Sequence, residues 1–131
     1  MIVIDSSAIV AILQEEAEAQ RFIEIVSAED RCVVSAVTVY EAAIVMNFRS
    51  GLGGVADVLD FLASSRAEIQ PFTEQTIPAA ISAYQRFGKG TGARAHLNFG
   101  DCVSYALARS LDAPLLFKGK DFAATDIRAA V

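Results

Sequence analysis

Short apolar runs alternate with longer segments of helical periodicity, and this alternation restricts the fold more than any other feature. "IVID" (residues 2–5), "CVVS" (32–35) and "PLLF" (114–117) have the pattern of strands, and "EIQPF" (68–72) is a weaker one. Strands this short and apolar are typical of burial on both faces of a sheet. Because helical segments separate them, the chain is predicted to form an α/β fold, a parallel sheet flanked by helices.

The helical segments carry apolar residues three and four positions apart. They lie around residues 8–13, 19–26, 39–50, 55–62, 77–84 and 103–111. The sequence "GLGG" is expected to separate the third helical segment from the fourth. At 131 residues and without internal repeats, residues 1–131 are expected to form a single domain.

Composition excludes several classes of protein. No run of 18 apolar residues is present, so no membrane span is expected. Asp5 follows the first apolar residues without a basic region, which argues against a signal peptide and for a cytoplasmic protein. Cys32 and Cys102 are therefore expected to be buried, reduced thiols. A single histidine, His96, leaves no recognisable Ser-His-Asp or Cys-His set and no His/Cys zinc site.

The net charge of −5 is unevenly distributed along the chain. Residues 1–83 hold four arginines against twelve acids, whereas residues 84–131 hold seven basic residues against four acids. The acidic total therefore does not exclude a nucleic-acid partner for the basic last third. Scattered surface charge gives similar imbalances.

Four carboxylates stand at the expected strand ends. Asp5 closes the first strand, Glu41 begins the helix after the second, Asp101 opens the helix before the fourth, and Asp121 follows the fourth. Ligand sites of parallel sheets form at the carboxyl ends of the strands, so these acids are expected to converge. Like charges held together favour a bound cation, and oxygen ligands favour Mg²⁺ or Mn²⁺.

Local capping is an alternative explanation for three of these acids. Glu41 stands three residues after Thr38, as in a capping box, and Asp101 stands three residues after Asn98. The acid after the fourth strand is also a common turn residue. Asp5 is harder to explain in this way, because an acid that closes a buried strand needs a partner.

Four blocks of the chain together resemble one known family. "IVIDSSAIVAIL", "VSAVTVYEAAIV", "LNFGDCVSYALA" and "LLFKGKDFAATD" resemble the PIN-domain family, and within it the VapC-type toxins of toxin–antitoxin pairs. The resemblance covers nearly the whole chain, in order and at normal spacing. It implies a three-layer sandwich whose central sheet has four to five short parallel strands.

The resemblance also implies a set of site residues. The catalytic and metal-binding acids of the family correspond to Asp5, Glu41, Asp101 and Asp121. Asp126 is a further candidate, Ser7 matches a small polar position that lines such sites, and Lys120 stands where many members have asparagine.

The implied activity is that of a Mg²⁺- or Mn²⁺-dependent endoribonuclease that hydrolyses RNA phosphodiester bonds. In this interpretation Asp5, Glu41 and Asp101 are ligands, and Asp121 holds a second ion or orients the water. Hydrolysis assisted by a metal needs no histidine. One ion or two are both compatible with the sequence.

Partners follow from the charge and the resemblance. Candidate phosphate contacts are Arg86, Lys89, Arg94, His96, Lys118 and Lys120, with a solvated loop as the alternative, which is favoured for Arg86. The resemblance implies a homodimer and a VapB-type antitoxin that lies in a groove between early helices and sends a basic side chain into the acidic pocket. Phe22, Met46 and Phe48 belong to the core by default, or to that groove.

Two other classes of function place acids at strand ends. A phospho-receiver or phosphatase-like domain needs paired acids or D-x-D after the first strand, whereas Asp5 is followed by Ser6 and Ser7. A non-catalytic RNA- or protein-binding module on the same fold differs only in activity.

Overall fold

The computed structural model describes residues 1–131 and contains one four-stranded parallel sheet of order β3-β2-β1-β4. The strands are β1 (Ile2–Ile4), β2 (Cys32–Ser35), β3 (Glu68–Gln70) and β4 (Leu115–Leu116). All four predicted strands are thus present, and β4 is shorter than "PLLF". A single parallel bridge between Leu115 and Ala129 continues the sheet beyond β4.

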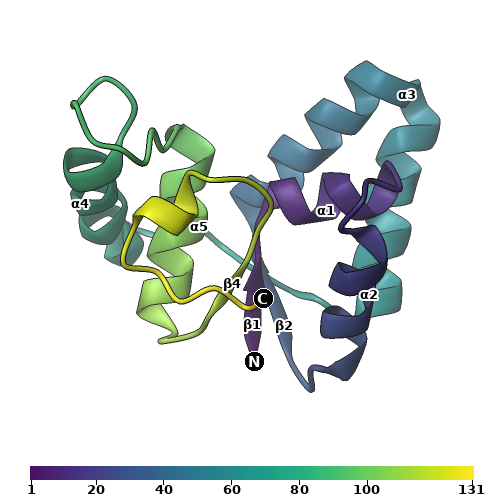
Figure 1. The fold of residues 1–131 in the computed structure, drawn as a ribbon. Helices are drawn as coiled ribbons and strands as arrows, with labels where there is room; N and C mark the ends of the chain where they lie inside the picture. The colour runs from purple at the N-terminus through teal and green to yellow at the C-terminus, as the bar shows by residue number, and fades with distance from the viewer.

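Five helices cover both faces of this sheet. They are α1 (Ser6–Leu13), α2 (Ala19–Ala28), α3 (Ala36–Ser65), α4 (Ile77–Phe87) and α5 (Phe99–Ser110). Helices α1, α2 and α3 lie on one side of the sheet, and α4 and α5 lie on the other (Figure 1). The predicted α/β sandwich of three layers is confirmed.

Alternate strand residues build two cores. Ile2 and Ile4 of β1 pack with α1, α2 and α3, whereas Val3 packs with α4 and α5. Each of the three is at most 1% exposed. A strand buried on both faces needs an unbroken apolar run, which is what "IVI" supplies.

Helix α3 contains the break that "GLGG" predicted. Gly51 has φ 62° and ψ −147°, outside the helical region, and the helix resumes at once. The two halves then fold closely together at Gly54, where an added Cβ would lie 2.8 Å from the carbonyl carbon of Met46. Glycine is needed at Gly51 for conformation and at Gly54 for space.

The burial expected of both cysteines is confirmed. Cys32 and Cys102 are buried and unpaired, and burial raises the pKa of both thiols, that of Cys102 to about 11. No helix has the length and apolar character needed to cross a membrane.

The strand order of the sheet singles out the edge between β1 and β4 as the expected place of a ligand site. The connections from β1 to β2 and from β2 to β3 add strands on one side of β1, whereas the connection from β3 to β4 crosses to the other side. The direction of the connections therefore changes between β1 and β4. Such a switch point is where parallel sheets bind ligands. The backbone N–H of Asp5 donates to the carbonyl of Leu116 at 3.0 Å, which places Asp5 at that point.

Candidate functional site: an acidic pocket at the switch point

Asp5 is fully buried and caps the N-terminus of α1. Its Oδ2 accepts hydrogen bonds from the backbone N–H of Ser7 (3.0 Å) and from the Ser7 hydroxyl (2.6 Å). Its Oδ1 accepts one from the Ser104 hydroxyl at 2.6 Å. A carboxylate offers about four lone-pair positions, so about one remains on Oδ1 for a cation.

Ser104 and Thr38 form a buried support behind Asp5 that sequence reasoning missed. Their hydroxyl oxygens lie 3.1 Å apart, and each side chain is 1% exposed. Buried hydroxyls are almost always hydrogen-bonded. A serine three residues after Asp101 on a buried helix was therefore an available signal.

The capping role suggested for Thr38 is wrong. Helix α3 begins at Ala36, and its N-cap is Ser35, whose hydroxyl accepts from the N–H of Val37 at 3.2 Å. The helix starts three residues earlier than a cap at Thr38 requires. Capping therefore does not account for Glu41.

Glu41 is half-buried on α3, and its Oε1 accepts a hydrogen bond from Ser6 at 2.6 Å. Gly100 lies against the carboxylate, since an added Cβ there would stand 2.7 Å from its Cδ. Burial raises the pKa of Glu41, the Ser6 bond lowers it, and the charge of Asp5 raises it. The carboxylate is thus confined between two neighbours.

Asp101 occupies the first turn of α5 and both caps the helix and faces the other acids. Its Oδ2 accepts from the N–H of Asn98 at 2.9 Å, and the Asn98 Oδ1 accepts from the N–H of Asp101 at 2.8 Å. The predicted capping box is therefore present. Burial raises the pKa of Asp101 to about 7; the Asn98 bond opposes this, and the charges of Asp5, Glu41 and Asp121 add to it.

Asp121 and Asp126 have different surroundings. Asp121 is exposed ahead of the short turn Phe122–Ala124 and makes no capping bond, but its charge contributes to the raised pKa of Asp101. Asp126 accepts from the Tyr105 hydroxyl (2.6 Å) and pairs with Arg86 (3.1 Å). The structure thus ties Asp126 to α4 and α5 and does not bring it into the pocket.

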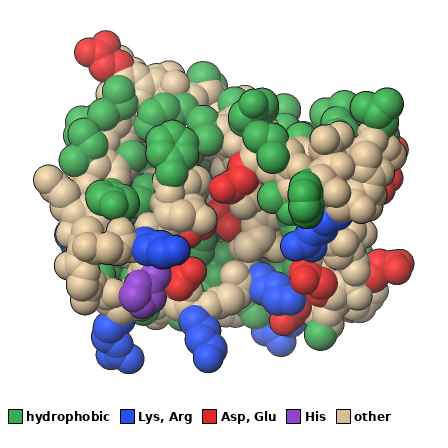
Figure 2. Space-filling view, turned by 90° about the horizontal axis from the view of Figure 1, so that it is seen from above, with side chains coloured by type: hydrophobic (Ala, Val, Ile, Leu, Met, Phe, Trp, Pro, Cys, Tyr) green, Lys and Arg blue, Asp and Glu red, His purple; other side chains and the backbone are tan.

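Asp5, Glu41 and Asp101 line one open cavity of about 460 Å³. Figure 2 looks onto this face, where acidic side chains lie near the centre and basic ones on two sides. No three of the acids converge within ligating distance of a common point, because each is turned toward a hydroxyl or a backbone N–H.

The cavity nevertheless fits a hard cation. Its donors are carboxylate and hydroxyl oxygens, the ligands that Mg²⁺ and Mn²⁺ prefer. Glu41 Oε2 and Asp101 Oδ1 accept no hydrogen bond from the protein and are therefore free to bind one. Burial raises the pKa of Asp101, and the charges of Asp5, Glu41 and Asp121 raise it further; a positive ion would relieve the repulsion among these acids.

The expected basic residues fall into two groups. Lys118 pairs with Glu16 (3.4 Å) and Glu18 (3.2 Å). Arg86 lies in the last turn of α4, pairs with Asp126 and stacks on the ring of Phe87, so the solvated loop favoured for it is wrong. Of the expected phosphate contacts, those that are exposed and make no ion pair are Lys89, Arg94, His96 and Lys120. Arg49 lines the cavity and was not anticipated.

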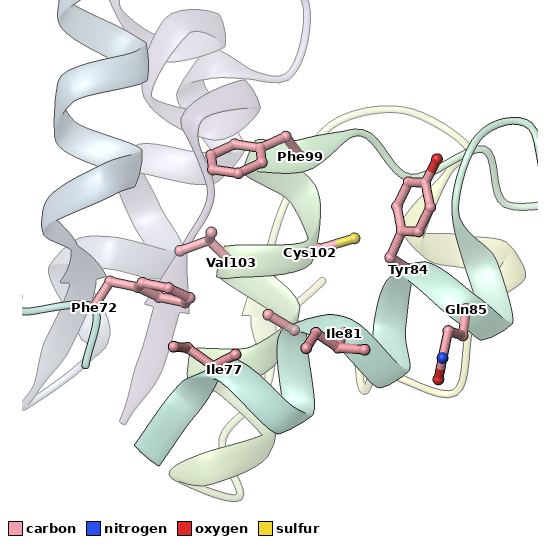
Figure 3. Close-up of a pocket in the computed structure, with 9 residues that line it drawn as sticks. Phe72, Ile77, Ile81, Tyr84, Gln85, Phe99, Cys102 and Val103 are labelled. Atoms are coloured by element: carbon pink, nitrogen blue, oxygen red, sulfur yellow. The ribbon is translucent and has the colours of Figure 1, made fainter. Parts of the chain in front are cut away.

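A second hollow, of about 590 Å³, lies between α4 and α5 and is almost wholly apolar. Figure 3 shows Ile77 and Ile81 of α4 facing Phe99 and Val103 of α5, with Phe72 at one end. No carboxylate, histidine or basic residue lines it. It is suited to packing against another surface, not to hydrolysis.

Known proteins resemble the chain along nearly its whole length. The PIN domain model matches residues 2–128. The chain is 41% identical over 125 residues to ribonuclease VapC30 of Mycobacterium tuberculosis, covering 95% of both, and 40% identical over 127 residues to ribonuclease VapC of Mycolicibacterium smegmatis, covering 97% of this chain and 98% of the relative. The crystal structure of Mycobacterium tuberculosis VapC20, a toxin that cleaves the sarcin-ricin loop, superposes with a TM-score of 0.78 at 16% identity, covering 97% of this chain and 96% of the other.

Proposed function

Because the chain belongs to the PIN-domain family, as its four sequence blocks predicted, we propose that it is an endoribonuclease and the toxin of a toxin–antitoxin pair. The observation that carries this proposal is the pocket of Asp5, Glu41 and Asp101 at the switch point of the sheet. The relatives named as ribonucleases support it. The reaction is hydrolysis of RNA phosphodiester bonds, and its place is the cytoplasm.

We propose Asp5, Glu41 and Asp101 as the ligands of Mg²⁺ or Mn²⁺. A divalent ion bound there supplies Lewis acidity to the scissile phosphodiester and an activated water at neutral pH. Asp121 is exposed and does not line the pocket, but its charge reaches Asp101, and it is proposed to orient the attacking water or to hold a second ion.

The remaining polar residues keep the acids in place. Ser7 and Ser104 hold the Asp5 carboxylate by both oxygens, so that it meets the cation in one orientation. Ser6 does the same for Glu41. Asp101 must lose its proton to bind the ion, which its pKa of about 7 allows at neutral pH and above.

A groove between α1, α2 and the second half of α3 is the proposed seat of the antitoxin. It has a volume of about 640 Å³, apolar side chains that include Leu13 and Phe61, and an acidic rim of Glu15, Asp57 and Asp60. Apolar and basic side chains on a partner segment complement such a groove. The structural relative from Klebsiella pneumoniae, a toxin–antitoxin complex with a TM-score of 0.69 and 15% identity, supports a partner of this kind.

A homodimer is proposed from a stripe of exposed apolar side chains on α3. Tyr40, Ile44 and Phe48 follow one another at intervals of four residues, and Phe48 is 91% exposed. The default expectation that Phe48 belongs to the core is wrong, because its side chain is exposed. Exposed apolar patches of this kind mark interaction surfaces.

Induction of the chain in a bacterial host tests the proposed function. Growth is expected to arrest, and new RNA 5′ ends are expected to accumulate at defined positions. The Asp5→Asn variant, at equal abundance, is expected to produce neither. A non-catalytic RNA-binding module would leave the RNA ends unchanged in both cells, and that result would contradict the proposal.

A further inference from the structure

The acidic pocket repels RNA, so cations beside it must offset the repulsion. Two of the nearby cations are already neutralised. Lys118 pairs with Glu16 and Glu18, and Arg86 pairs with Asp126. The cations that remain available are those without a carboxylate partner.

Arg49 is an unpaired cation that lines the pocket itself. It stands on α3 eight residues after Glu41, with Val45 between them, and all three line the same cavity. Its exposed guanidinium makes no hydrogen bond to the protein, so its donors are free. An arginine fork of this kind matches a phosphate with two parallel hydrogen bonds.

A second basic position lies on the other side of the sheet. Arg94 and Lys120, neither of them in an ion pair, line a hollow of about 420 Å³ whose other lining residues are Ala123 and Ala124. Lys120 directly precedes Asp121. Arg94 belongs to the loop between α4 and α5, whereas α3 lies in the opposite layer (Figure 1).

These positions bracket the carboxylates. Resting on the proposed cleavage of RNA, we propose that one RNA strand crosses the acidic pocket with one phosphate bound by Arg49 and another bound in the hollow of Arg94 and Lys120. The strand is then held on both sides of the scissile bond. Figure 2 shows Lys and Arg side chains on two sides of the acids near the centre of this face.

Binding of a short fluorescent single-stranded RNA, followed by anisotropy, tests the proposal. The Asp101→Asn background prevents cleavage during the measurement. Arg49→Ala and the pair Arg94→Ala/Lys120→Ala are each expected to weaken binding about tenfold. Each lost phosphate contact is also expected to lower the slope of log affinity against log salt by about 0.7.

Arg21→Ala is the matched control, because Arg21 is an exposed, unpaired arginine on α2 that lines a different hollow near the C-terminus. It removes the same charge and is expected to change affinity less than about twofold. Arg49 and the pair of Arg94 and Lys120 make separate contacts, so a variant that combines all three substitutions is expected to lose about a hundredfold in RNA affinity.

Two outcomes overturn the proposal in distinguishable ways. Equal binding by Arg49→Ala and Arg21→Ala, while the parent binds RNA, removes Arg49 from the path and leaves the proposed function standing. If the parent neither binds nor cuts any RNA, the proposed function and this inference are both wrong.

Discussion

At the residue scale, the position of one buried carboxylate governs the site. Asp5 is held by Ser7 and Ser104, and Thr38 supports Ser104 from behind. Burying an acid is costly unless its oxygens are hydrogen-bonded. The hydroxyls satisfy that need and at the same time fix the direction of the remaining lone pair.

Ser104→Ala tests this support. The variant leaves an oxygen of Asp5 and the hydroxyl of Thr38 short of a partner, which is expected to lower the free energy of unfolding by about 1–3 kcal/mol. Affinity for Mn²⁺, measured by calorimetric titration, is expected to fall about tenfold. Ser110→Ala is the control, because that hydroxyl, on the same helix, only donates to the carbonyl of Leu107. Equal losses of Mn²⁺ affinity in both variants would contradict the role of Ser104.

Gly100→Ala tests the confinement of Glu41. The added methyl group would overlap the Glu41 carboxylate, which is the movable end of a side chain, so stability is expected to change by less than about 1 kcal/mol. The displaced carboxylate is expected to slow RNA cleavage about a hundredfold. If Gly100→Ala kept full cleavage activity and an unchanged free energy of unfolding, the position of the Glu41 carboxylate would not matter for the reaction.

The pKa of Asp101 predicts how stability depends on pH without metal. It is raised from 3.8 to about 7, so the folded state holds a proton that the unfolded chain loses. The resulting stabilisation is fully present below about pH 4 and is lost as pH rises through about 7. In urea unfolding, the parent is therefore expected to lose stability relative to Asp101→Asn across this range, and saturating Mn²⁺ at pH 8 is expected to restore it. A constant difference between the two proteins would be inconsistent with the raised pKa.

Sequence reasoning anticipated the gathering of Asp5, Glu41 and Asp101, because the ends of parallel strands lie at one edge of a sheet. It did not anticipate Ser104, since which buried hydroxyl meets which acid depends on the packing of α5 against β1. Nor did it separate Asp126 from the site. That acid pairs with a residue 40 positions away, and no local pattern reports such a contact.

At the scale of elements, the break in α3 lets the helix cover the sheet and then reverse. Gly51 adopts a backbone conformation that other residues tolerate poorly, whereas Gly53, also in α3, has open space around its Cα. Gly51→Ala is expected to lower the free energy of unfolding by about 1–3 kcal/mol. Gly53→Ala is expected to raise it by about 0.5–1 kcal/mol. Urea unfolding of both variants checks the pair, and stabilisation by Gly51→Ala would contradict the assigned break.

Periodicity found the elements because each side of the sheet has its own apolar pattern. It did not find their ends. The start of α3 at Ala36 depends on the hydroxyl of Ser35, which also ends a buried strand. It also misplaced Phe48, because an apolar residue at helical spacing can face a partner as well as a core.

At the scale of the whole molecule, exposed apolar side chains lie over α3 on one layer and over α4 and α5 on the other. The stripe of Tyr40, Ile44 and Phe48 is the proposed surface of the homodimer. Light scattering is expected to give twice the chain mass for the parent and the monomer mass for Ile44→Glu/Phe48→Glu. Leu59→Glu, in the second half of α3 and also exposed, is expected to remain dimeric. A monomeric parent would contradict the assignment.

The central claim is that the carboxylates at the switch point hold a divalent cation that the chain uses to cut RNA. The most direct measurement is cleavage of an end-labelled RNA by the purified chain in Mg²⁺ or Mn²⁺, in excess EDTA, and by Asp101→Asn. Cleavage is expected only when the cation is present, and the rate for Asp101→Asn is expected to be lower by about a hundredfold or more, with folding intact. Cleavage that persists in EDTA, or that is as fast in Asp101→Asn as in the parent, would contradict it.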